Sequence, residues 1–262
     1  MLRGLLIILL LLSSGPAGAQ TPSLVERGTI TFGLSATFPP FETIDNGKPA
    51  GFDIDLAALL AKKLTLTSTV GTFEFKGLIP ALLGKRIDAI ISGMYINADR
   101  QQVADFVPYL LVGNQIVVRK GNPASLGDPM SLCGHRVSTP VGTVFEVAAN
   151  KVNAACEAAG KPKLSMLSLA GTTACALALT QDRADAIIVS TPTAASLIQA
   201  TPDAYQAAGT PFDNDTKVGI AVNKDNPALL AALNKAMQAV VADGSYAALL
   251  AHWNLPPSSS AF

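Results

Sequence analysis

Short apolar runs alternate along the chain with helical repeats of leucine and with polar turns. Residues 29–34 and 67–74 read as strands, and residues 52–64 carry leucines three or four positions apart, the period of an amphipathic helix. Residues 78–83 predict a short helix that ends at Gly84. Residues 88–92 form an apolar strand, typical of parallel strands buried on both faces.

A second series of the same kind follows a β-rich run at 115–119. Its strands are predicted at 136–138, 164–169 and 186–189, and its helices at 144–159, 173–180 and 193–200. A strand at 218–222 and two helices at 227–242 and 246–253 complete the chain. Strands that alternate with helices predict an α/β fold with mostly parallel sheets.

Two segments of the chain have similar sequences. Residues 81–92 (ALLGKRIDAIIS) and 178–190 (ALTQDRADAIIVS) both run from a helix end through Arg and Asp into an apolar strand that ends in Ser. A repeat this short also arises by chance. As a structural repeat, it predicts two α/β units with Ser92 and Ser190 at strand ends, where open α/β sheets bind ligands. Two such edges facing each other would form a cleft.

The first residues have the pattern of an export signal. Arg3 is followed by an unbroken apolar run at 5–12 and by the small residues Ala17-Gly18-Ala19, a typical cleavage site. The run is too short to span a bilayer, which disfavours the alternative of a membrane anchor. We therefore predict a signal peptide at 1–19 and a periplasmic location.

Composition excludes several functional classes. The chain has 19 basic and 19 acidic residues, so nothing in its charge indicates a nucleic acid or an anionic membrane as partner. His135 and His252 are the only histidines, and neither has metal-ligand spacing from a cysteine. No metal site and no cofactor are predicted. A hydrophobic content of 49% supports one large core or two modest ones.

Three cysteines leave one thiol unpaired if a disulfide forms. In an oxidising periplasm, Cys133 and Cys156 are the best pair for a disulfide, because each lies near the end of a predicted element. Closing the loop between them would stabilise the fold by about 3 kcal/mol in the chain-entropy model. Cys175 lies in the apolar segment TACALAL and is predicted to be a small buried hydrophobe.

Residues 88–100, DAIISGMYINADR, carry the candidate chemistry. An apolar strand ends at Ser92 and Gly93, and a polar turn leads to Arg100 at a predicted helix start. Ser92 and nearby N–H groups can donate to an anion, while the planar guanidinium of Arg100 pairs with a carboxylate through two bonds. The alternative is an ordinary strand end followed by a surface arginine.

An ordered set of segments resembles the periplasmic amino-acid-binding proteins of ABC importers, the type II solute-binding proteins of family 3. The segments are TFPPFE (37–42), GKPAGFDIDLAALLAKKL (47–64), GLIPALLGKRIDAIISGM (77–94), ADRQQVADFVPY (98–109), VVRKGNP (117–123), LCGHRVSTPVGT (132–143), RADAIIVSTP (183–192), VGIAVNKDNP (218–227) and DGSYAALLAHW (243–253). The resemblance implies a two-lobed α/β fold with a mostly parallel sheet and flanking helices in each lobe. Lobe 1 would comprise 24–112 plus 217–262 and lobe 2 would comprise 113–216, with hinge crossovers near 110–114 and 211–217.

The resemblance also implies ligand-binding positions. Arg100 matches the family's carboxylate-binding arginine, and Ser92 matches a residue that contacts the ligand beside it. Phe38 and Phe75 match aromatic positions that sandwich the ligand. The remaining expected contacts are Gly93, Met94 and Tyr95 in the same segment as Arg100, Thr143 and Val144 at a second-lobe helix N-terminus suited to an anion, and Ser190.

Several positions depart from the family pattern. Ser190 stands where the family has the carboxylate that binds the ligand's ammonium group, and Ser35 replaces another common acid. Tyr95 replaces a Ser or Thr. Because a hydroxyl cannot neutralise a buried ammonium, we expect a small carboxylate with a neutral, partly apolar body: an amino acid held unusually, or an acid without a free α-amino group. Asp213 or Asp215 could compensate from the return crossover.

The expected function is solute capture by a monomer that closes on its ligand and delivers it to an inner-membrane ABC permease. Two alternatives remain. One is a periplasmic prephenate or arogenate dehydratase, with its general acid among Glu42, Glu74 and Glu146. We expect instead that the chain is not an enzyme. The other is a ligand sensor for a signalling partner. Residues 256–262 read as a loose tail.

Overall fold

A computed structural model describes residues 22–262, so the predicted signal peptide lies outside the described residues. Eight strands form one sheet in the order β4-β1-β5-β10-β6-β9-β7-β8. The strands are β1 (Thr29–Leu34), β4 (Thr67–Thr72), β5 (Ala89–Ile90), β6 (Ala104–Arg119), β7 (Arg136–Pro140), β8 (Ser165–Leu169), β9 (Ala186–Ser190) and β10 (Tyr205–Asn223). A small hairpin joins β2 (Thr43–Asp45) to β3 (Lys48–Ala50).

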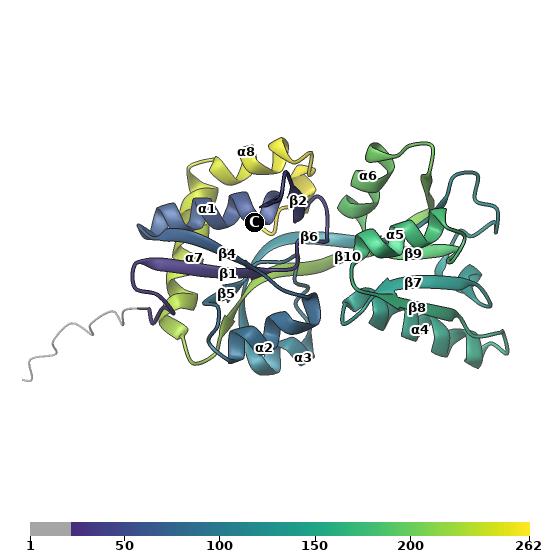
Figure 1. The fold of residues 1–262 in the computed structure, drawn as a ribbon, viewed down its shortest axis with the longest axis horizontal. Helices are drawn as coiled ribbons and strands as arrows, with labels where there is room; N and C mark the ends of the chain where they lie inside the picture. The colour runs from purple at the N-terminus through teal and green to yellow at the C-terminus, as the bar shows by residue number, and fades with distance from the viewer. Residues whose placement is uncertain (1–21) are drawn as a thin grey trace, which may run out of the picture.

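Helices cover both faces of this sheet. They are α1 (Phe52–Leu64), α2 (Leu78–Leu83), α3 (Ala98–Val103), α4 (Val144–Ala158), α5 (Thr172–Thr180), α6 (Thr191–Ala200), α7 (Pro227–Ala242) and α8 (Ser245–His252). Figure 1 shows two bodies connected by β6 and β10. We call the body with β1, β4, β5, α1, α2, α3, α7 and α8 lobe 1, and the body with β7, β8, β9, α4, α5 and α6 lobe 2.

The predicted α/β architecture is confirmed. β1 pairs in parallel with β4 and β5, and β7 pairs in parallel with β8 and β9. β6 and β10 run antiparallel to each other and to their other neighbours. Each lobe therefore contributes three parallel strands to the sheet, and these end toward the other lobe, while the two long strands between them connect the lobes covalently.

The two long strands extend well beyond their predicted lengths. The apolar runs at 115–119 and 218–222 mark only their ends, because Pro108, Gly209 and Pro211 and the polar residues 213–217 interrupt the alternation. The ladder between β6 and β10 is irregular at three points, including the stretch from Phe212 to Thr216. Pairing between the strands, rather than a local apolar pattern, holds these segments extended.

The similarity between the segments at 81–92 and 178–190 has a structural basis. In lobe 1 the Asp88 N–H donates to Thr31 O at 2.8 Å, and the Asp88 carboxylate accepts from Thr31 N at 2.7 Å. In lobe 2 the Asp185 N–H donates to Arg136 O at 2.8 Å, and its carboxylate accepts from Arg136 N at 2.9 Å. Each aspartate thus ties its own strand to the start of a neighbouring parallel strand.

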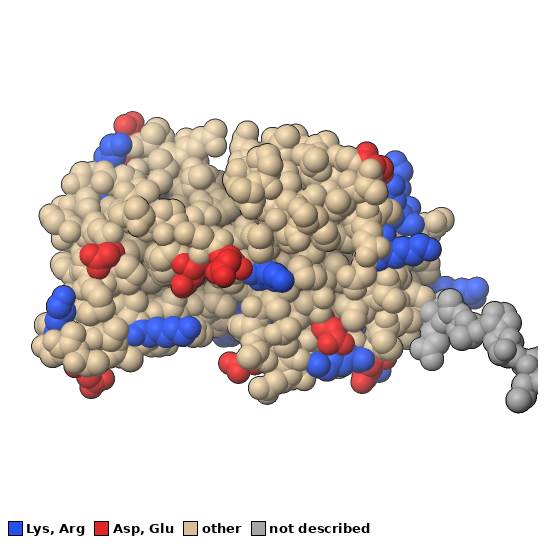
Figure 2. Space-filling view, turned by 180° about the vertical axis from the view of Figure 1, so that it is seen from behind, with Lys and Arg blue, Asp and Glu red and all other residues tan. Residues whose placement is uncertain are grey.

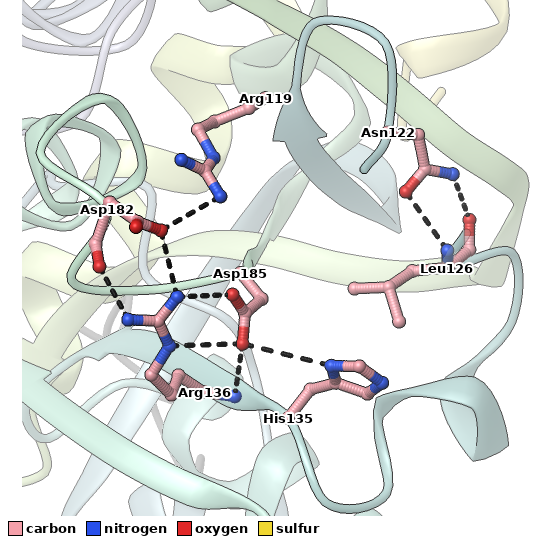
Figure 3. A network of polar contacts seen from close by, with 7 residues as sticks. All are labelled: Arg119, Asn122, Leu126, His135, Arg136, Asp182 and Asp185. Carbon is pink, nitrogen blue, oxygen red and sulfur yellow. Dashed lines mark hydrogen bonds and ion pairs between the residues drawn. The ribbon is translucent and has the colours of Figure 1, made fainter. Parts of the chain in front are cut away.

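The lobe 2 aspartate belongs to a wider network at the end of that lobe distant from lobe 1. The Arg136 guanidinium donates to the Asp185 carboxylate at 2.6 Å and to Asp182 Oδ1 at 2.9 Å, and Arg119 also pairs with Asp182 at 2.9 Å (Figure 3). These ion pairs lower the pKa of Asp182 and Asp185. Because Arg136 and Asp182, which connect these ion pairs, are exposed, the network stabilises the lobe only modestly.

The disulfide prediction is confirmed. Cys133 and Cys156 are bonded, with their Cα atoms 5.7 Å apart, and the bridge ties the turn before β7 to the end of α4. Cys175 is free and completely buried on α5, as expected for a small core residue, and burial raises the pKa of its thiol to about 12. The thiol is therefore protonated at neutral pH.

The C-terminal segment is ordered against lobe 1, so the prediction of a loose tail is wrong. Ser260 pairs with Leu110 of β6, Ser259 is buried, and Phe262 packs edge-on against Tyr246 of α8 at 5.8 Å. The tail gains these contacts because α8 places it beside the hinge strand. Its serines and prolines gave no indication of them.

Charged side chains are dispersed over the surface. Figure 2 shows small groups of both signs on the back of the molecule, in agreement with the equal numbers of acidic and basic residues. Over residues 22–262, no helix has the length and apolarity needed to cross a membrane. The same residues contain no cluster of His, Cys, Asp and Glu that could hold a metal ion.

Candidate ligand-binding cleft

A cavity of about 390 Å³, counting the part open to solvent, lies between the lobes. Lobe 1 contributes Ser35, Thr37, Phe38, Phe75, Gly93, Tyr95 and Arg100, and lobe 2 contributes Pro140, Thr143, Val144, Phe145, Ala170, Gly171 and Thr172. Arg100 is the one charged residue in this lining, which holds no Asp, Glu or His. The cavity is therefore mostly apolar, with a single cationic wall.

Arg100 is buried, and no acidic side chain of residues 22–262 forms an ion pair with it. It lies in α3, whose N-cap Asn97 accepts from the Arg100 N–H at 2.9 Å. Its guanidinium donates to Tyr95 O at 2.8 Å and to Gly142 O of lobe 2 at 3.4 Å, and it lies 5.3 Å from the Phe75 ring centre. Only 9% of the residue is exposed, and burial lowers the pKa of the guanidinium to about 10. It therefore remains charged at neutral pH.

Three aromatic rings meet across the cleft. Phe145, the second residue of α4, lies 5.9 Å from Phe38 and 5.4 Å from Tyr95, both of lobe 1, measured between ring centres. Phe145 is 3% exposed, so its ring fills the space between the lobe 1 rings. The aromatic wall of the cavity is thus built from both lobes and limits its depth.

Two helices of lobe 2 begin at the cavity. α4 starts after Thr143, whose hydroxyl accepts from Glu146 N at 3.4 Å, and α5 starts after Gly171. A Cβ on Gly171 would lie 2.6 Å from Thr37 Oγ1, so the absence of a side chain allows lobe 1 to approach α5 closely. Helix N-termini carry a partial positive charge and free N–H groups, which favours an anion in the space between them.

The positions predicted from the sequence divide into two sets. Seven of them line the cavity: Phe38, Phe75, Gly93, Tyr95, Arg100, Thr143 and Val144. Ser92, Met94 and Ser190 are buried outside the lining. Their role as ligand contacts stays a prediction.

The two serines at the strand ends are engaged in the protein interior. Ser92 Oγ donates to the Glu42 carboxyl group and accepts from Ser35 N at 3.1 Å. Ser190 is the N-cap of α6, where its Oγ accepts from Thr193 N at 3.2 Å and donates to Thr193 Oγ1 at 2.8 Å. Both side chains hold backbone that borders the cavity.

Two completely buried carboxyl groups lie behind the segment at 92–93. Asp53 of α1 accepts from Gly93 N at 2.6 Å and from the Tyr109 hydroxyl at 2.8 Å. Burial raises the pKa of Asp53 to about 6. Burial also raises the pKa of Glu42 well above its usual value, and the negative charge of Asp53 raises it further. Within residues 22–262, no basic side chain forms an ion pair with either group, so burial favours the protonated form of Glu42.

Asp213 and Asp215 do not line the cavity. Asp213 accepts from Asn114 Nδ2 at 3.3 Å, and both aspartates line a separate groove on the hinge side. That groove shares Tyr95 and Val144 with the cavity wall. Asp213 and Asp215, which could have replaced the carboxylate missing at Ser190, therefore lie next to the cavity rather than in it.

Sequence reasoning missed Phe145 and the segment Ala170 to Thr172. Phe145 follows the matched pair Thr143 and Val144 directly, so the family pattern gave its place but not its role. The segment Ala170 to Thr172 is the turn from β8 into α5, and a Gly-Thr-Thr turn after a strand is a weak signal of a helix start at a binding edge.

Comparisons with known proteins agree with this architecture. The family model for bacterial extracellular solute-binding proteins, family 3, matches residues 30–256. The L-cystine-binding protein TcyJ of Escherichia coli (strain K12) is 31% identical over 87% of this chain and 83% of its own length. The ABC transporter arginine-binding protein 1 of the same strain is 32% identical over 95% of this chain and 98% of its own.

Solved structures give the same result. An ancestral arginine-binding protein bound to arginine superposes with a TM-score of 0.80 at 36% identity, covering 87% of this chain and 98% of that one. A further similar structure, with a TM-score of 0.76 at 31% identity, covering 87% of this chain and 96% of that one, is an ancestral amino acid-binding protein described as a precursor of cyclohexadienyl dehydratase.

Proposed function

The chain belongs to the bacterial extracellular solute-binding proteins, family 3, and we propose that it captures a small carboxylate between its lobes and delivers it to an ABC permease. Its relatives include amino-acid-binding proteins of ABC transporters, two of which are described as binding L-cystine and arginine. Together with the predicted signal peptide, this supports a periplasmic location.

The observation that carries the proposal is the unpaired guanidinium of Arg100. A buried charge without a counter-ion is costly, and two backbone carbonyls satisfy hydrogen bonds without neutralising it. A ligand carboxylate would provide the missing charge and could accept two parallel bonds from the guanidinium. The N-termini of α4 and α5 favour the same negative charge from the opposite wall.

The ligand body is neutral in this proposal. No acidic side chain lines the cavity, and the Ser190 hydroxyl is engaged with Thr193 at the start of α6. An ammonium or guanidinium group on the ligand would be buried without a counter-ion. We therefore expect the protein to discriminate against Arg, Lys and His, although a relative of this chain is described as binding arginine.

The cavity favours binding over catalysis. A dehydratase needs a general acid or base within reach of its substrate. Of the candidates, Glu42 is buried behind the cavity, Glu74 is largely exposed beside Lys76, and Glu146 accepts from Gly142 N and Ser168 Oγ. None of the three lines the cavity.

Closure would couple binding to delivery. The Arg100 bond to Gly142 and the approach of Gly171 to Thr37 both cross between the lobes. A ligand held by Arg100 and by the lobe 2 helix N-termini would contact both walls only in the closed state. It would therefore shift the population toward that state, whose shape a permease could recognise.

Isothermal titration calorimetry with organic acids, amino acids and N-acylated amino acids tests this proposal. We expect at least one neutral-bodied carboxylate to bind, and Arg100→Ala to weaken it at least tenfold. Arg86→Ala is a matched control, because Arg86 lies 5.2 Å from the Phe73 ring in lobe 1 but outside the cavity. Tight binding of Lys, Arg or His, or binding unaffected by Arg100→Ala, would contradict the proposal.

A further inference from the structure

The hydroxyl of Tyr95 is buried in the cleft without a hydrogen-bond partner. Tyr95 lines the cavity and is 3% exposed, and its Oη atom has no partner among residues 22–262. Buried polar groups are nearly always hydrogen-bonded, and each exception calls for an explanation. Leaving such a group unsatisfied destabilises the folded protein.

The surroundings of Tyr95 fix the ring in place. Its ring packs edge-on against Phe145 of lobe 2, and its backbone carbonyl accepts from the Arg100 guanidinium at 2.8 Å. The Tyr95 phenol and the Arg100 cation therefore belong to one small site. Burial raises the pKa of the phenol above its usual value, so the hydroxyl keeps its proton and can donate.

No group within residues 22–262 has hydrogen-bonding geometry to Tyr95 Oη. The Ser190 hydroxyl, at the start of α6, lies near enough to lower the pKa of the phenol, against the larger rise caused by burial, but it forms its hydrogen bonds with Thr193 Oγ1 and Thr193 N. The other ring that packs against Phe145, Phe38, is apolar. An ammonium group cannot accept a hydrogen bond from the phenol, and no carboxylate in the lining would balance its charge.

We propose that the ligand is a short carboxylic acid that bears an uncharged oxygen, a hydroxyl or carbonyl group, which accepts a hydrogen bond from Tyr95 while its carboxylate pairs with Arg100. This inference rests on the proposed function and names its substrate class as hydroxy and oxo acids. A keto oxygen or a hydroxyl oxygen accepts from the phenol without introducing charge. The aromatic wall of Phe38 and Phe145 excludes water from the bond, and limits the length of the acid.

Two matched series of acids test the inference by calorimetry. The first is propanoate, lactate, pyruvate and alanine, and the second is 3-phenylpropanoate, phenyllactate, phenylpyruvate and phenylalanine. Each series changes only the substituent next to the carboxylate. In at least one series, we expect the hydroxy or oxo acid to bind at least tenfold more tightly than both the unsubstituted acid and the amino acid, because a site with an unpaired buried donor rejects ligands that lack the acceptor.

Tyr95→Phe isolates the hydroxyl. The variant should lower the preference for the hydroxy or oxo acid over the unsubstituted acid, expressed as the ratio of their affinities, at least tenfold. Tyr205→Phe is the matched control, because the Tyr205 hydroxyl donates to Ala176 O at 3.0 Å in lobe 2, away from the cavity. Without ligand, Tyr95→Phe should unfold at the same or a higher temperature than the wild type, whereas Tyr205→Phe should unfold at a lower one.

The outcomes separate the two proposals. Two outcomes would overturn the substrate class and leave carboxylate capture intact. In the first, binding depends on Arg100 but is tightest for the amino acids. In the second, Tyr95→Phe prefers the hydroxy or oxo acid as strongly as the wild type does. A lower unfolding temperature for Tyr95→Phe overturns the premise that its hydroxyl is unpaired. Failure of every carboxylate in the broader calorimetric screen to bind overturns carboxylate capture, and the substrate class with it.

Discussion

The carboxylate of Asp53 accepts a hydrogen bond from Gly93 N at 2.6 Å, and this contact ties α1 to the segment that forms one wall of the cleft. Beside it, Ser92 Oγ donates to Glu42, so two buried carboxyl groups hold Gly93 of the wall and the residue that precedes it. The candidate ligand site is therefore positioned from behind by acids that lie outside the cavity lining. Their protonation should couple the stability of the fold to pH.

The first prediction concerns that coupling. Burial raises the pKa of Asp53 from 3.8 to about 6 in the folded protein. Between about pH 4 and 6 the folded state therefore binds more protons than the unfolded chain, and the free energy of unfolding falls as pH rises, by about 3 kcal/mol from this group. The raised pKa of Glu42 extends the loss to higher pH. Other acids with lowered pKa values, such as Asp185, oppose this trend below about pH 4.

Glu42→Gln isolates the contribution of the pair, because the amide keeps the shape of the carboxyl group and cannot ionise. Melting temperatures measured from pH 5 to 8 should fall less with pH in Glu42→Gln than in the wild type. Glu26→Gln, at an exposed position, should follow the wild-type curve. Parallel curves for Glu42→Gln and the wild type would show that Glu42 does not change its charge in this range.

The second prediction concerns the aromatic wall. Phe145→Ala should enlarge the cavity, because the ring fills the space between Phe38 and Tyr95. We expect affinity to rise at least tenfold for a phenyl-bearing acid relative to its three-carbon counterpart, measured by calorimetry. Val147→Ala, on the exposed side of the same helix, should leave this ratio unchanged. An unchanged ratio in Phe145→Ala would mean that another residue sets the ligand size.

The third prediction is a gain of ammonium binding. Ser190→Asp retains a good N-cap for α6 and introduces a carboxylate at the position where the resemblance to the family implies one. Combined with Tyr95→Ser, which makes room beside it, the change should improve binding of an amino acid relative to its 2-hydroxy analogue at least tenfold. Ser190→Asn with Tyr95→Ser is the uncharged control. Equal preference in the two double variants would argue against a charge effect.

The fourth prediction concerns the disulfide. Cys133 and Cys156 are 23 residues apart, and opening such a loop costs about 3 kcal/mol in the chain-entropy model. Denaturant unfolding with and without reductant should show a loss of this size, and Cys133→Ser with Cys156→Ser should reproduce it. Alkylation without reductant, followed by mass spectrometry, should modify Cys175 alone, and only in the unfolded chain, because that thiol is buried. Equal stability with and without reductant would contradict this prediction.

Much of the fold could be predicted because local patterns and tertiary structure agree. The helices at 78–83 and 227–242 have the predicted bounds, since Gly84 and the Asn226-Pro227 start mark their ends in the sequence. The repeat could also be predicted, because Asp88 and Asp185 occupy the same place in the two similar segments and each bonds to a neighbouring strand of its own lobe. β6 and β10 could not be predicted at full length, because each is held extended by the other, and their polar middle residues show no alternation.

The candidate site was predicted only in part for a similar reason. Arg100 lies in a segment, 98–109, that resembles the family pattern, and Tyr95 stands out just before that segment as a departure from the pattern. The contribution of Phe145 depends on how the lobes meet, and the positioning role of Glu42 and Asp53 depends on contacts across 50 and 40 residues of sequence. Neither the role of Phe145 nor that of the two acids is indicated by the sequence immediately around those residues.

A crystal structure of the protein with its physiological ligand, identified by mass spectrometry of what co-purifies, tests the central claim most directly. We predict a ligand carboxylate within about 3 Å of the Arg100 guanidinium nitrogens, in the geometry of a charge-assisted pair. A bound ligand whose carboxylate lies elsewhere, with Arg100 retaining only its contacts to Tyr95 O and Gly142 O, would contradict the account.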